Sequence, residues 1–157
     1  MRRDYFELDV RDVDWYEEDD TPRQPTVSID FYGPPEELRE RFSAPGGDVL
    51  ASGDLDVSLR LQGPITETDT RGVVSVTDRL TGDYVLELNA DAEDVLYFIG
   101  AAREYGRNSD DKDGHYRVDV AIEGEHFATF EKSMFLVYDV DGSLLRGRSL
   151  IPSGVEL

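Results

Sequence analysis

The stretch Leu55-Asp56-Val57-Ser58-Leu59-Arg60-Leu61 alternates apolar and polar side chains at every position. Successive side chains of an extended strand point to opposite faces, so this pattern predicts a β-strand with one buried face and one hydrated face. A helix would instead repeat its apolar positions with a period of about 3.6 residues. The same alternation recurs in four other segments, residues 6–10, 27–31, 84–88 and 118–122.

Glycine-containing turns join several apolar segments into hairpins. Glycine readily takes the positive φ that tight hairpin turns require. With a two-residue turn at Glu123-Gly124, Ile122 pairs with Glu125 and Ala121 pairs with His126. Counting all such segments, the sequence predicts eight or nine strands. The three turn glycines are Gly82, Gly124 and Gly142.

Two segments follow the helical period. Residues 92–105 carry an apolar stripe, and Asp91 precedes them as an N-cap. Residues 35–42 begin with a proline and place acidic side chains early and arginines late, which suits the helix dipole. We expect one long helix and one short helix. The stripe of the long helix consists of Val95, Phe98, Ile99 and Ala102.

The number of one-sided strands decides the predicted architecture. Because one long helix cannot cover eight or nine strands, two sheets must face each other. We therefore predict a mainly β (α+β) fold, a two-layer antiparallel β-sandwich-like domain with one long helix and one short helix. The long helix is expected at an edge or across one end, and a single sheet curled around it is the alternative. Residues 1–157 form a single domain in this prediction.

Charge is the most unusual property of the sequence. It contains 35 acidic and 16 basic residues, for a formal net charge of -19, and only two of the bases are lysines. The acids are spread between the apolar positions of every segment, which indicates a folded core inside an anionic shell. Such a shell repels itself, and molar salt screens this repulsion, so we predict adaptation to high salt. A nucleic-acid mimic is the alternative, and it would gather its charge on one face.

Four segments carry a resemblance to known proteins: Met1-Arg2-Arg3-Asp4-Tyr5-Phe6, Leu86-Glu87-Leu88-Asn89-Ala90-Asp91, Phe135-Leu136-Val137-Tyr138-Asp139 and Ser149-Leu150-Ile151-Pro152-Ser153-Gly154-Val155-Glu156-Leu157. They are similar to a family of uncharacterised haloarchaeal proteins of unknown function, and the similarity extends over nearly the whole chain. The resemblance implies a halophilic source. It assigns no site residue, cofactor or activity.

The sequence offers few residues for catalysis or metal binding. It has no cysteine, which excludes thiol chemistry and disulfides. The predicted hairpin separates the two histidines, His115 and His126, so we expect no metal site. The acidic loop at residues 109–114 lacks the final bidentate acid of an EF-hand. Nucleotide-binding and nucleophile motifs are absent, so enzymatic function is disfavoured and no cofactor is expected.

The chain is expected to be cytoplasmic and to act away from membranes. Its first residues lack the apolar stretch of a signal peptide, and no later run approaches the length of a membrane span. Direct nucleic-acid binding is not expected, because phosphate backbones require clustered Lys and Arg and counterion release is weak in molar salt. A protein partner is the expected ligand, and the sequence does not predict an oligomeric state.

The C-terminal segment is the candidate site because its composition departs from that of the rest. Residues 143–157 carry two arginines against one acid, and the tail is apolar. Arginine binds carboxylates through two parallel hydrogen bonds. The alternative is a tail that folds back onto its own domain, with its arginines paired to surface acids. The candidate partner-binding residues are Arg146, Arg148, Leu150, Ile151, Val155 and Leu157.

These observations favour a non-enzymatic cytosolic interaction or adaptor module over an enzyme. The alternative is a small-molecule-binding domain, or a minor enzyme with a pocket between sheet and helix. A deep pocket with convergent polar groups is typical of that alternative. A flat apolar patch or an unpaired sheet edge is typical of an interaction module.

Overall fold

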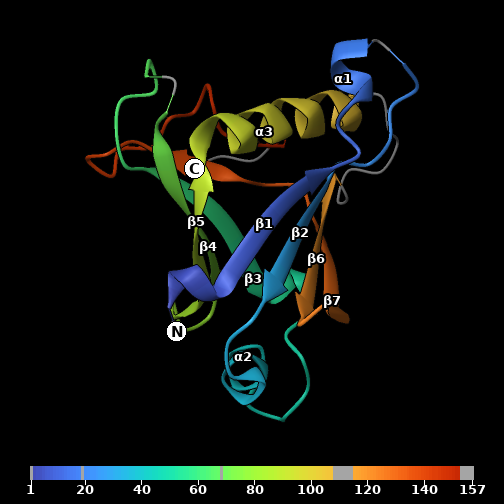
Figure 1. Cartoon of the computed structure of the whole chain (residues 1–157), viewed down its shortest axis with the longest axis vertical. Helices are drawn as coiled ribbons and strands as arrows, with labels where there is room; N and C mark the ends of the chain where they lie inside the picture. Colours follow the sequence, from blue (N-terminus) through green and yellow to red (C-terminus); the bar gives the residue numbers. More distant parts are fainter. Residues whose placement is uncertain (1, 19, 68, 108–114, 153–157) are drawn as a thin grey trace.

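Two four-stranded sheets form the body of the protein in the computed structural model (Figure 1). The structure describes residues 2–18, 20–67, 69–107 and 115–152. The predicted mainly β, two-layer architecture is confirmed. The first sheet consists of β1 (Phe6–Arg11), β2 (Thr26–Phe31), β6 (Tyr116–Ile122) and β7 (Glu125–Lys132), in that order. The second consists of β5 (Tyr84–Asp91), β4 (Arg71–Asp78), β3 (Leu55–Leu61) and β8 (Leu136–Tyr138), in that order.

Each sheet contains one parallel pair of strands, so both sheets are mixed rather than purely antiparallel as expected. β2 runs parallel to β6, and β3 runs parallel to β8. The other neighbouring strands are antiparallel. Parallel neighbours require a long crossover connection. The chain provides one by forming β3, β4, β5 and the long helix between β2 and β6. The chain therefore alternates between the sheets: β6 and β7 complete the first sheet after β3, β4 and β5 of the second, and β8 completes the second sheet last.

The β6–β7 hairpin has the predicted register. Ile122 pairs with Glu125 and Ala121 pairs with His126. The two turn residues both have positive φ, 51° at Glu123 and 83° at Gly124. That combination matches the right-handed twist of the flanking strands. The turn is therefore a tight two-residue connection, as the sequence predicted.

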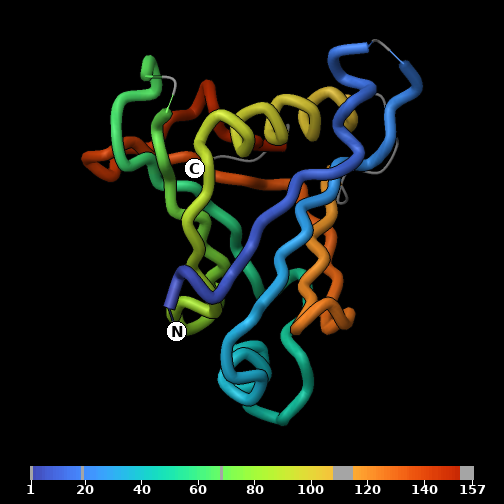
Figure 2. The backbone as a smooth tube through the Cα atoms, viewed as in Figure 1, coloured from blue at the N-terminus to red at the C-terminus, as the bar shows by residue number. Residues whose placement is uncertain are grey.

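Helix α3 (Ala92–Arg107) crosses one end of the two sheets (Figures 1 and 2). It begins directly after β5 and contacts β5, β1 and β3, so it touches both sheets. The predicted apolar stripe is buried, with Phe98 and Ile99 almost completely inaccessible. The helix is longer than predicted because its last turn continues to Arg107.

The short helix α2 (Pro35–Arg41) lies at the opposite end of the molecule (Figure 1). Its Leu38 and the following Phe42 are fully buried. The ring of Phe42 packs edge-on against Phe127 of β7, with 5.5 Å between centroids. The two predicted helices are therefore present, and each packs against one end of the sandwich.

Some local structure differs from the sequence prediction. A short helix α1 (Trp15–Glu18), which the sequence did not predict, follows β1, and its Trp15 is buried. β8 spans only 3 residues. Residues 143–146 form no strand, and Leu144 makes a single bridge to Tyr138. Two 3₁₀ turns, η1 (Arg3–Tyr5) and η2 (Ser52–Asp54), precede β1 and β3.

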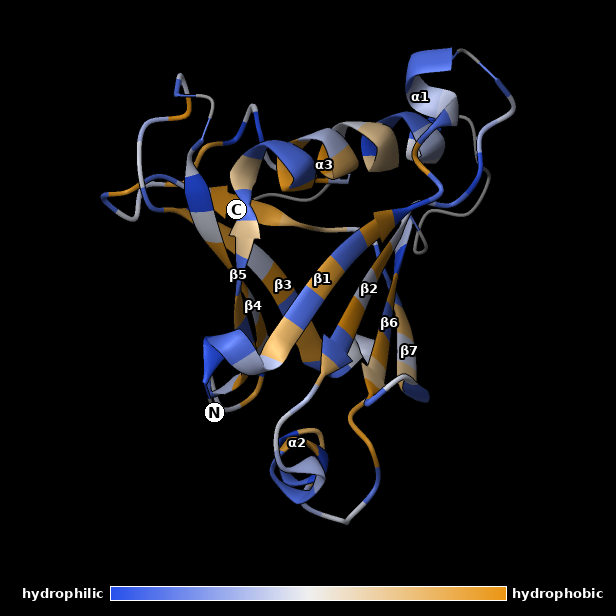
Figure 3. Cartoon of the chain, in the orientation of Figure 1, coloured by the Kyte–Doolittle hydropathy of each residue, from blue (hydrophilic) through white to orange (hydrophobic). Residues whose placement is uncertain are grey.

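The core lies between the apolar faces of the two sheets. The strands show alternating hydrophobic and hydrophilic bands, as expected for one dry face and one wet face (Figure 3). Ile29 and Val120 of the first sheet share one buried cluster with Leu59 and Val76 of the second. No Asp or Glu is buried among the described residues, so the acidic side chains lie in the half-buried and exposed outer layer.

Lys132 is the only buried charged side chain in the described part of the chain. Its Nζ donates hydrogen bonds to the carbonyl oxygens of Ser52, at 2.8 Å, and Leu55, at 2.6 Å. These carbonyls lie at the entrance to β3, whereas Lys132 ends β7. The lysine therefore joins the two sheets at one edge of the sandwich.

Candidate functional site

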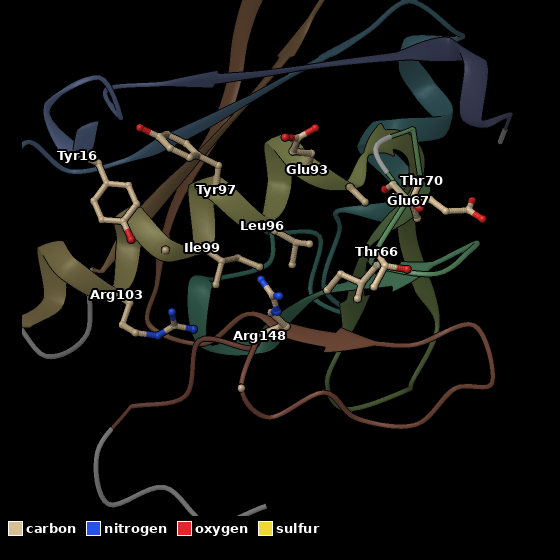
Figure 4. A pocket seen from close by; sticks show the side chains of 14 residues that line it. Tyr16, Thr66, Glu67, Thr70, Glu93, Leu96, Tyr97, Ile99, Arg103 and Arg148 are labelled. Atoms are coloured by element: carbon tan, nitrogen blue, oxygen red, sulfur yellow. Dashed lines mark hydrogen bonds between the residues drawn. The ribbon is translucent and has the colours of Figure 1, made fainter. Parts of the chain in front are cut away.

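An open groove of about 520 Å³ runs along the outer side of helix α3. We call it the helix groove. Its walls are the helix, the loop between β3 and β4, and the C-terminal segment at residues 147–148 (Figure 4). Ile65, Leu96 and Tyr97 give it apolar surface, whereas Arg103 and Arg148 extend into it from opposite walls (Figure 4). Glu67 and Glu93 also line the groove, so it combines apolar contact area with two guanidinium groups and two carboxylates (Figure 4).

A second groove of about 410 Å³ continues past the C-terminal end of α3. We call it the terminal groove. It shares Arg103 and Gly147 with the helix groove, so the two adjoin. Arg107 and Arg146 also line it, and its floor includes residues 149–152 of the C-terminal segment. Among the described residues that line it, none is Asp or Glu.

The two grooves gather four of the fourteen arginines of a strongly acidic chain. Nη2 of Arg103 donates a hydrogen bond to the backbone oxygen of Ser149 at 2.9 Å, which fixes its guanidinium against the C-terminal segment. Arg107 forms an exposed ion pair with Glu104 at 3.4 Å. The side chain of Arg148 has no hydrogen-bond or ion-pair partner within the described ranges. Of these four arginines, Arg148 is therefore the one most available to an external group.

Aromatic side chains form the far wall of the helix groove. The rings of Tyr16 and Tyr97 meet edge to face, with 5.3 Å between centroids. Tyr16 lies over Gly100, where a Cβ atom would come within 3.1 Å of its hydroxyl. Desolvation, and then the neighbouring Glu17 carboxylate, raise the pKa of Tyr97. A tyrosine phenol is neutral near pH 7 even at its ordinary pKa of about 10, so Tyr97 can donate a hydrogen bond there.

The structure separates the predicted C-terminal site residues into three groups. Arg146 and Arg148 are exposed, and Ile151 is half-buried beside them in the terminal groove. Leu150 is only 4% exposed and pairs with Phe135 through two backbone hydrogen bonds. Val155 and Leu157 lie outside the described residues.

The segment up to Leu150 is thus docked on its own domain, as in the alternative stated for this tail. Ser149 is also buried, and its hydroxyl accepts a hydrogen bond from the backbone N–H of Val137 at 2.8 Å. Leu150 and Ser149 support β8. Of the predicted site residues in the described part of the tail, only the exposed arginines and the half-buried Ile151 remain as surface.

The histidines lie apart and have different surroundings. His126 shares a 2.7 Å hydrogen bond with Thr129, which donates to Asp119 at 2.8 Å. His115 lines the terminal groove, and its Nδ1 is buried without a hydrogen-bond partner in the described structure. No group of three potential metal ligands occurs among the described residues. The loop at residues 109–114, weighed for calcium, lies outside them.

A larger groove of about 1030 Å³ lies between α2 and the β4–β5 turn. Acidic side chains dominate its polar lining, including Glu37, Glu40, Asp78 and Asp83. In a chain this acidic, such a cluster is the expected hydrated surface. It therefore gives no separate indication of a ligand.

Sequence reasoning did not identify the helix as part of the site. Leu96, Gly100, Arg103 and Arg107 follow one another at three- or four-residue intervals, so they share one face of α3. The buried stripe occupies another face, and the arginines could be explained by the helix dipole alone. The spacing of these residues therefore indicated a shared helix face. Only the position of the C-terminal segment beside that face shows that it lines a groove.

Comparison with known proteins identifies a family but no relative of known activity. Searches of curated proteins and of solved structures each found no significant match. In the described part of the chain, no helix is both long enough and apolar enough to cross a membrane. A family model described as a family of unknown function, DUF5793, matches residues 1–157. The chain therefore belongs to DUF5793, a family of unknown function.

Proposed function

We propose that this protein is a non-enzymatic interaction module of a haloarchaeal cytoplasm, and that it holds a partner protein in the helix groove. The observation that carries the proposal is the apolar surface of Ile65, Leu96 and Tyr97 beside Arg148, whose side chain has no partner among the described residues. Apolar contact with a charged anchor is the usual make-up of a protein interface.

The charge of the chain supports the high-salt setting. A net charge of -19 is carried by acids that lie outside the core. In molar salt, long-range steering between charged proteins is screened. A partner must then be held by apolar burial and by short-range hydrogen bonds. The helix groove offers both kinds of contact.

The shape of the groove favours a protein partner over a small molecule. A small-molecule site usually encloses most of its ligand. The helix groove is open along its length, and the cavity in the core between the sheets has a volume of only about 10 Å³. That cavity holds at most about one water molecule. An open trough instead suits an extended chain or a loop of another protein.

Quantitative pull-down at native salt tests this function. Leu96→Asp places a charge in the groove, and Arg148→Glu reverses an exposed charge without disturbing the core. Leu80→Asp and Arg39→Glu make the same changes at exposed positions outside the groove. We expect each groove variant to capture at least about tenfold less partner protein than the wild type does. This decrease corresponds to a loss of about 1.4 kcal/mol of binding free energy.

The controls are expected to capture the same partners as the wild type within about twofold. Circular dichroism must show that all four variants are folded. Equal capture by Arg148→Glu and the wild type would contradict the proposal. Deletion tests of the tail should begin after Pro152, because removal of Ser149 and Leu150 would also remove the support of β8.

A further inference from the structure

The wall that α3 contributes to the helix groove changes its charge along the helix. Glu93, Leu96, Gly100 and Arg103 follow one another at three- or four-residue intervals, so they share one face of α3 and line the groove in that order. Arg103 follows Glu93 by 10 positions, which corresponds to about 15 Å along a helix axis. This wall therefore carries a carboxylate near one end, apolar surface in the middle and a guanidinium near the other end (Figure 4).

The other walls repeat this order of charges. The loop between β3 and β4 carries Glu67 and is tied to the start of α3, because the N–H of Ala92 donates a hydrogen bond to the carbonyl of Thr70 at 3.0 Å. The C-terminal segment carries Arg148 and is tied to a later turn of α3 by the hydrogen bond from Arg103. Acids therefore lie toward the start of the helix, and arginines lie farther along it (Figure 4).

Local structure explains only half of this arrangement. Glu93 lies in the first turn of α3, where the helix dipole stabilises an acid. Arg103 holds the C-terminal segment through its hydrogen bond. Glu67 and Arg148 have neither role, and their side chains have no hydrogen-bond or ion-pair partner among the described residues. Two exposed charges of opposite sign thus line one groove without pairing with each other.

The backbones that carry these two charges are held in place. The hydroxyl of Thr70 bonds back to the carbonyls of Pro64 and Glu67, which closes the loop on itself. The N–H of Arg148 donates a hydrogen bond to the carbonyl three residues earlier at 3.1 Å, and the next residue, Ser149, is buried. A groove whose walls are already ordered loses less conformational entropy when it binds a ligand.

We infer that the helix groove binds an extended segment of the partner protein that carries a basic, an apolar and an acidic side chain at positions i, i+2 and i+4. This inference rests on the proposed function, because it names the chemistry of the partner. Alternate residues of an extended strand point to the same side, so positions i and i+4 lie about 13–14 Å apart. That span matches the helix length of about 15 Å between the acidic and the basic end of the groove.

The balance of charge in the groove selects such a mixed segment over one of a single sign. Among the described residues that line it, two are acids and two are arginines, whereas the whole sequence has 35 acids and 16 bases. A segment of one sign brings like charges together at one end of the groove, which costs binding free energy. In a mixed segment, the base meets Glu67 and Glu93, the apolar side chain meets Leu96 and Ile65, and the acid can form two parallel hydrogen bonds with Arg148.

Fluorescence anisotropy with defined peptides in about 2 M KCl tests the inference, since such salt leaves only short-range contacts. The probe is a fluorescein-labelled, end-capped peptide with Lys, Leu and Asp at alternate positions and Ser between them, called the mixed peptide. Replacing its Lys by Asp gives an acidic peptide, and replacing its Asp by Lys gives a basic peptide. A fourth peptide has Ser in place of Leu.

The protein variants change the charge at one end of the groove. They are Arg148→Glu and the double variant Glu67→Arg with Glu93→Arg. Glu36, like Glu93, lies in the first turn of a helix, so its substitution reproduces the loss of an acid from that position. Circular dichroism at the same salt checks that every variant is folded. The matched controls, at exposed positions outside the groove, are Arg39→Glu and the double variant Glu36→Arg with Glu125→Arg.

We expect the wild type and both controls to bind the mixed peptide at least about tenfold more tightly than each of the other three peptides, which corresponds to about 1.4 kcal/mol. Arg148→Glu should abolish the preference for the mixed over the basic peptide. The double groove variant should bind the acidic peptide best. Equal binding of the mixed, acidic and basic peptides by the wild type, an unchanged preference in either groove variant, or no binding of the mixed peptide would each overturn the inference.

These failures are distinguishable from a failure of the proposed function. If the mixed peptide has no advantage but Leu96→Asp and Arg148→Glu still lose the captured partners, the helix groove remains a protein-binding site with another specificity. If neither effect is seen, both proposals fail. A dimer of the wild type in sedimentation that Leu96→Asp converts to a monomer would assign the groove to a second copy of the chain and overturn the inference. Free aspartate that competes as tightly as the mixed peptide binds would assign it to a small molecule, with the same consequence.

Discussion

Two buried titratable side chains lie opposite each other where β6 begins and β7 ends. Tyr116 and Lys132 are register partners in this antiparallel pair. Burial raises the pKa of Tyr116 well above its ordinary value. Burial also lowers the pKa of Lys132, and the nearby Arg79 cation lowers it further. The two pKa shifts have opposite effects on stability in alkaline solution. On raising the pH, folded Lys132 releases its proton before unfolded Lys132 does, whereas folded Tyr116 keeps its proton longer than unfolded Tyr116.

The signs follow from proton binding in the folded and unfolded states. Unfolded Lys132 still holds a proton at pH values where the folded lysine has lost it, so its contribution to stability rises as pH approaches about 10.5. Folded Tyr116 keeps its proton above pH of about 10, where the unfolded tyrosine ionises. The contribution of Tyr116 is therefore complete below that pH and is lost as pH rises through its folded pKa.

Tyr116→Phe isolates the tyrosine effect. The Tyr116 hydroxyl donates a 2.7 Å hydrogen bond to the carbonyl of Met134, so the variant should lose about 1–3 kcal/mol of unfolding free energy near neutral pH. Above pH of about 10 the wild type loses stability through ionisation of unfolded Tyr116, so the difference between the two proteins should shrink. Urea unfolding at high salt and several pH values measures both. Tyr84→Phe, at an exposed position, is the control, and an unchanged difference up to pH of about 11 would contradict the assignment.

At the scale of elements, helix α3 has two faces with different tasks. One face closes the end of the sandwich with Phe98 and Ile99, and the other forms the wall of the helix groove with Leu96 and Arg103. Ile99 also lines the groove from below, so the packed face supports the binding surface. The position of the grooves consequently depends on the packing of the helix against both sheets.

Ile99→Ala tests how firmly the helix is held. Ile99 is 1% exposed, and removal of a buried large side chain usually costs about 2–5 kcal/mol of unfolding free energy. Leu80→Ala is the control, because Leu80 is 84% exposed and the change should cost less than about 0.5 kcal/mol. Both values come from urea unfolding followed by circular dichroism. A loss below about 0.5 kcal/mol for Ile99→Ala would mean that this helix face does not stabilise the fold.

The elements differ in how far the sequence predicts them. Strict alternation located β3, and the apolar stripe located α3, because each pattern reports which side of an element is buried. The same patterns carry no information about which strands become neighbours. The parallel pairing of β2 with β6 was therefore missed. Helix α1 was missed because its four residues are too few to show a helical repeat of apolar positions.

The whole molecule brings together a site that the sequence could only partly indicate. The composition of the C-terminal segment pointed to Arg146 and Arg148, and both line the grooves. Arg103 and Arg107 come from α3, 39 to 45 positions before Arg146 and Arg148, and only the docking of the tail places them beside it. A site built from separate segments is visible in the fold and not in a local pattern. The burial of Leu150 likewise follows from its backbone pairing with Phe135, the residue just before β8.

Salt acts on the whole molecule through two opposing effects. It weakens the seven ion pairs found among the described residues, and it screens the mutual repulsion of a chain with a net charge of -19. Pairs on the surface are worth only about 0.2–1 kcal/mol each. The excess acids repel one another over the entire surface. We therefore expect screening of the repulsion to dominate and the fold to require salt.

Far-UV circular dichroism should show loss of β structure when the protein is transferred from about 2–3 M KCl to about 0.05 M KCl. Over that range the Debye length rises from below about 3 Å to more than about 10 Å, so neighbouring acids on the sandwich come to repel one another fully. Sucrose at high concentration serves as the control, because it favours compact states by exclusion without screening charge. We expect sucrose to restore less of the β structure at low salt than KCl does, because it leaves the repulsion between the acids in place. A melting temperature that is the same at both salt concentrations would contradict the prediction. It would mean that repulsion between the acids does not measurably destabilise the folded state at low salt.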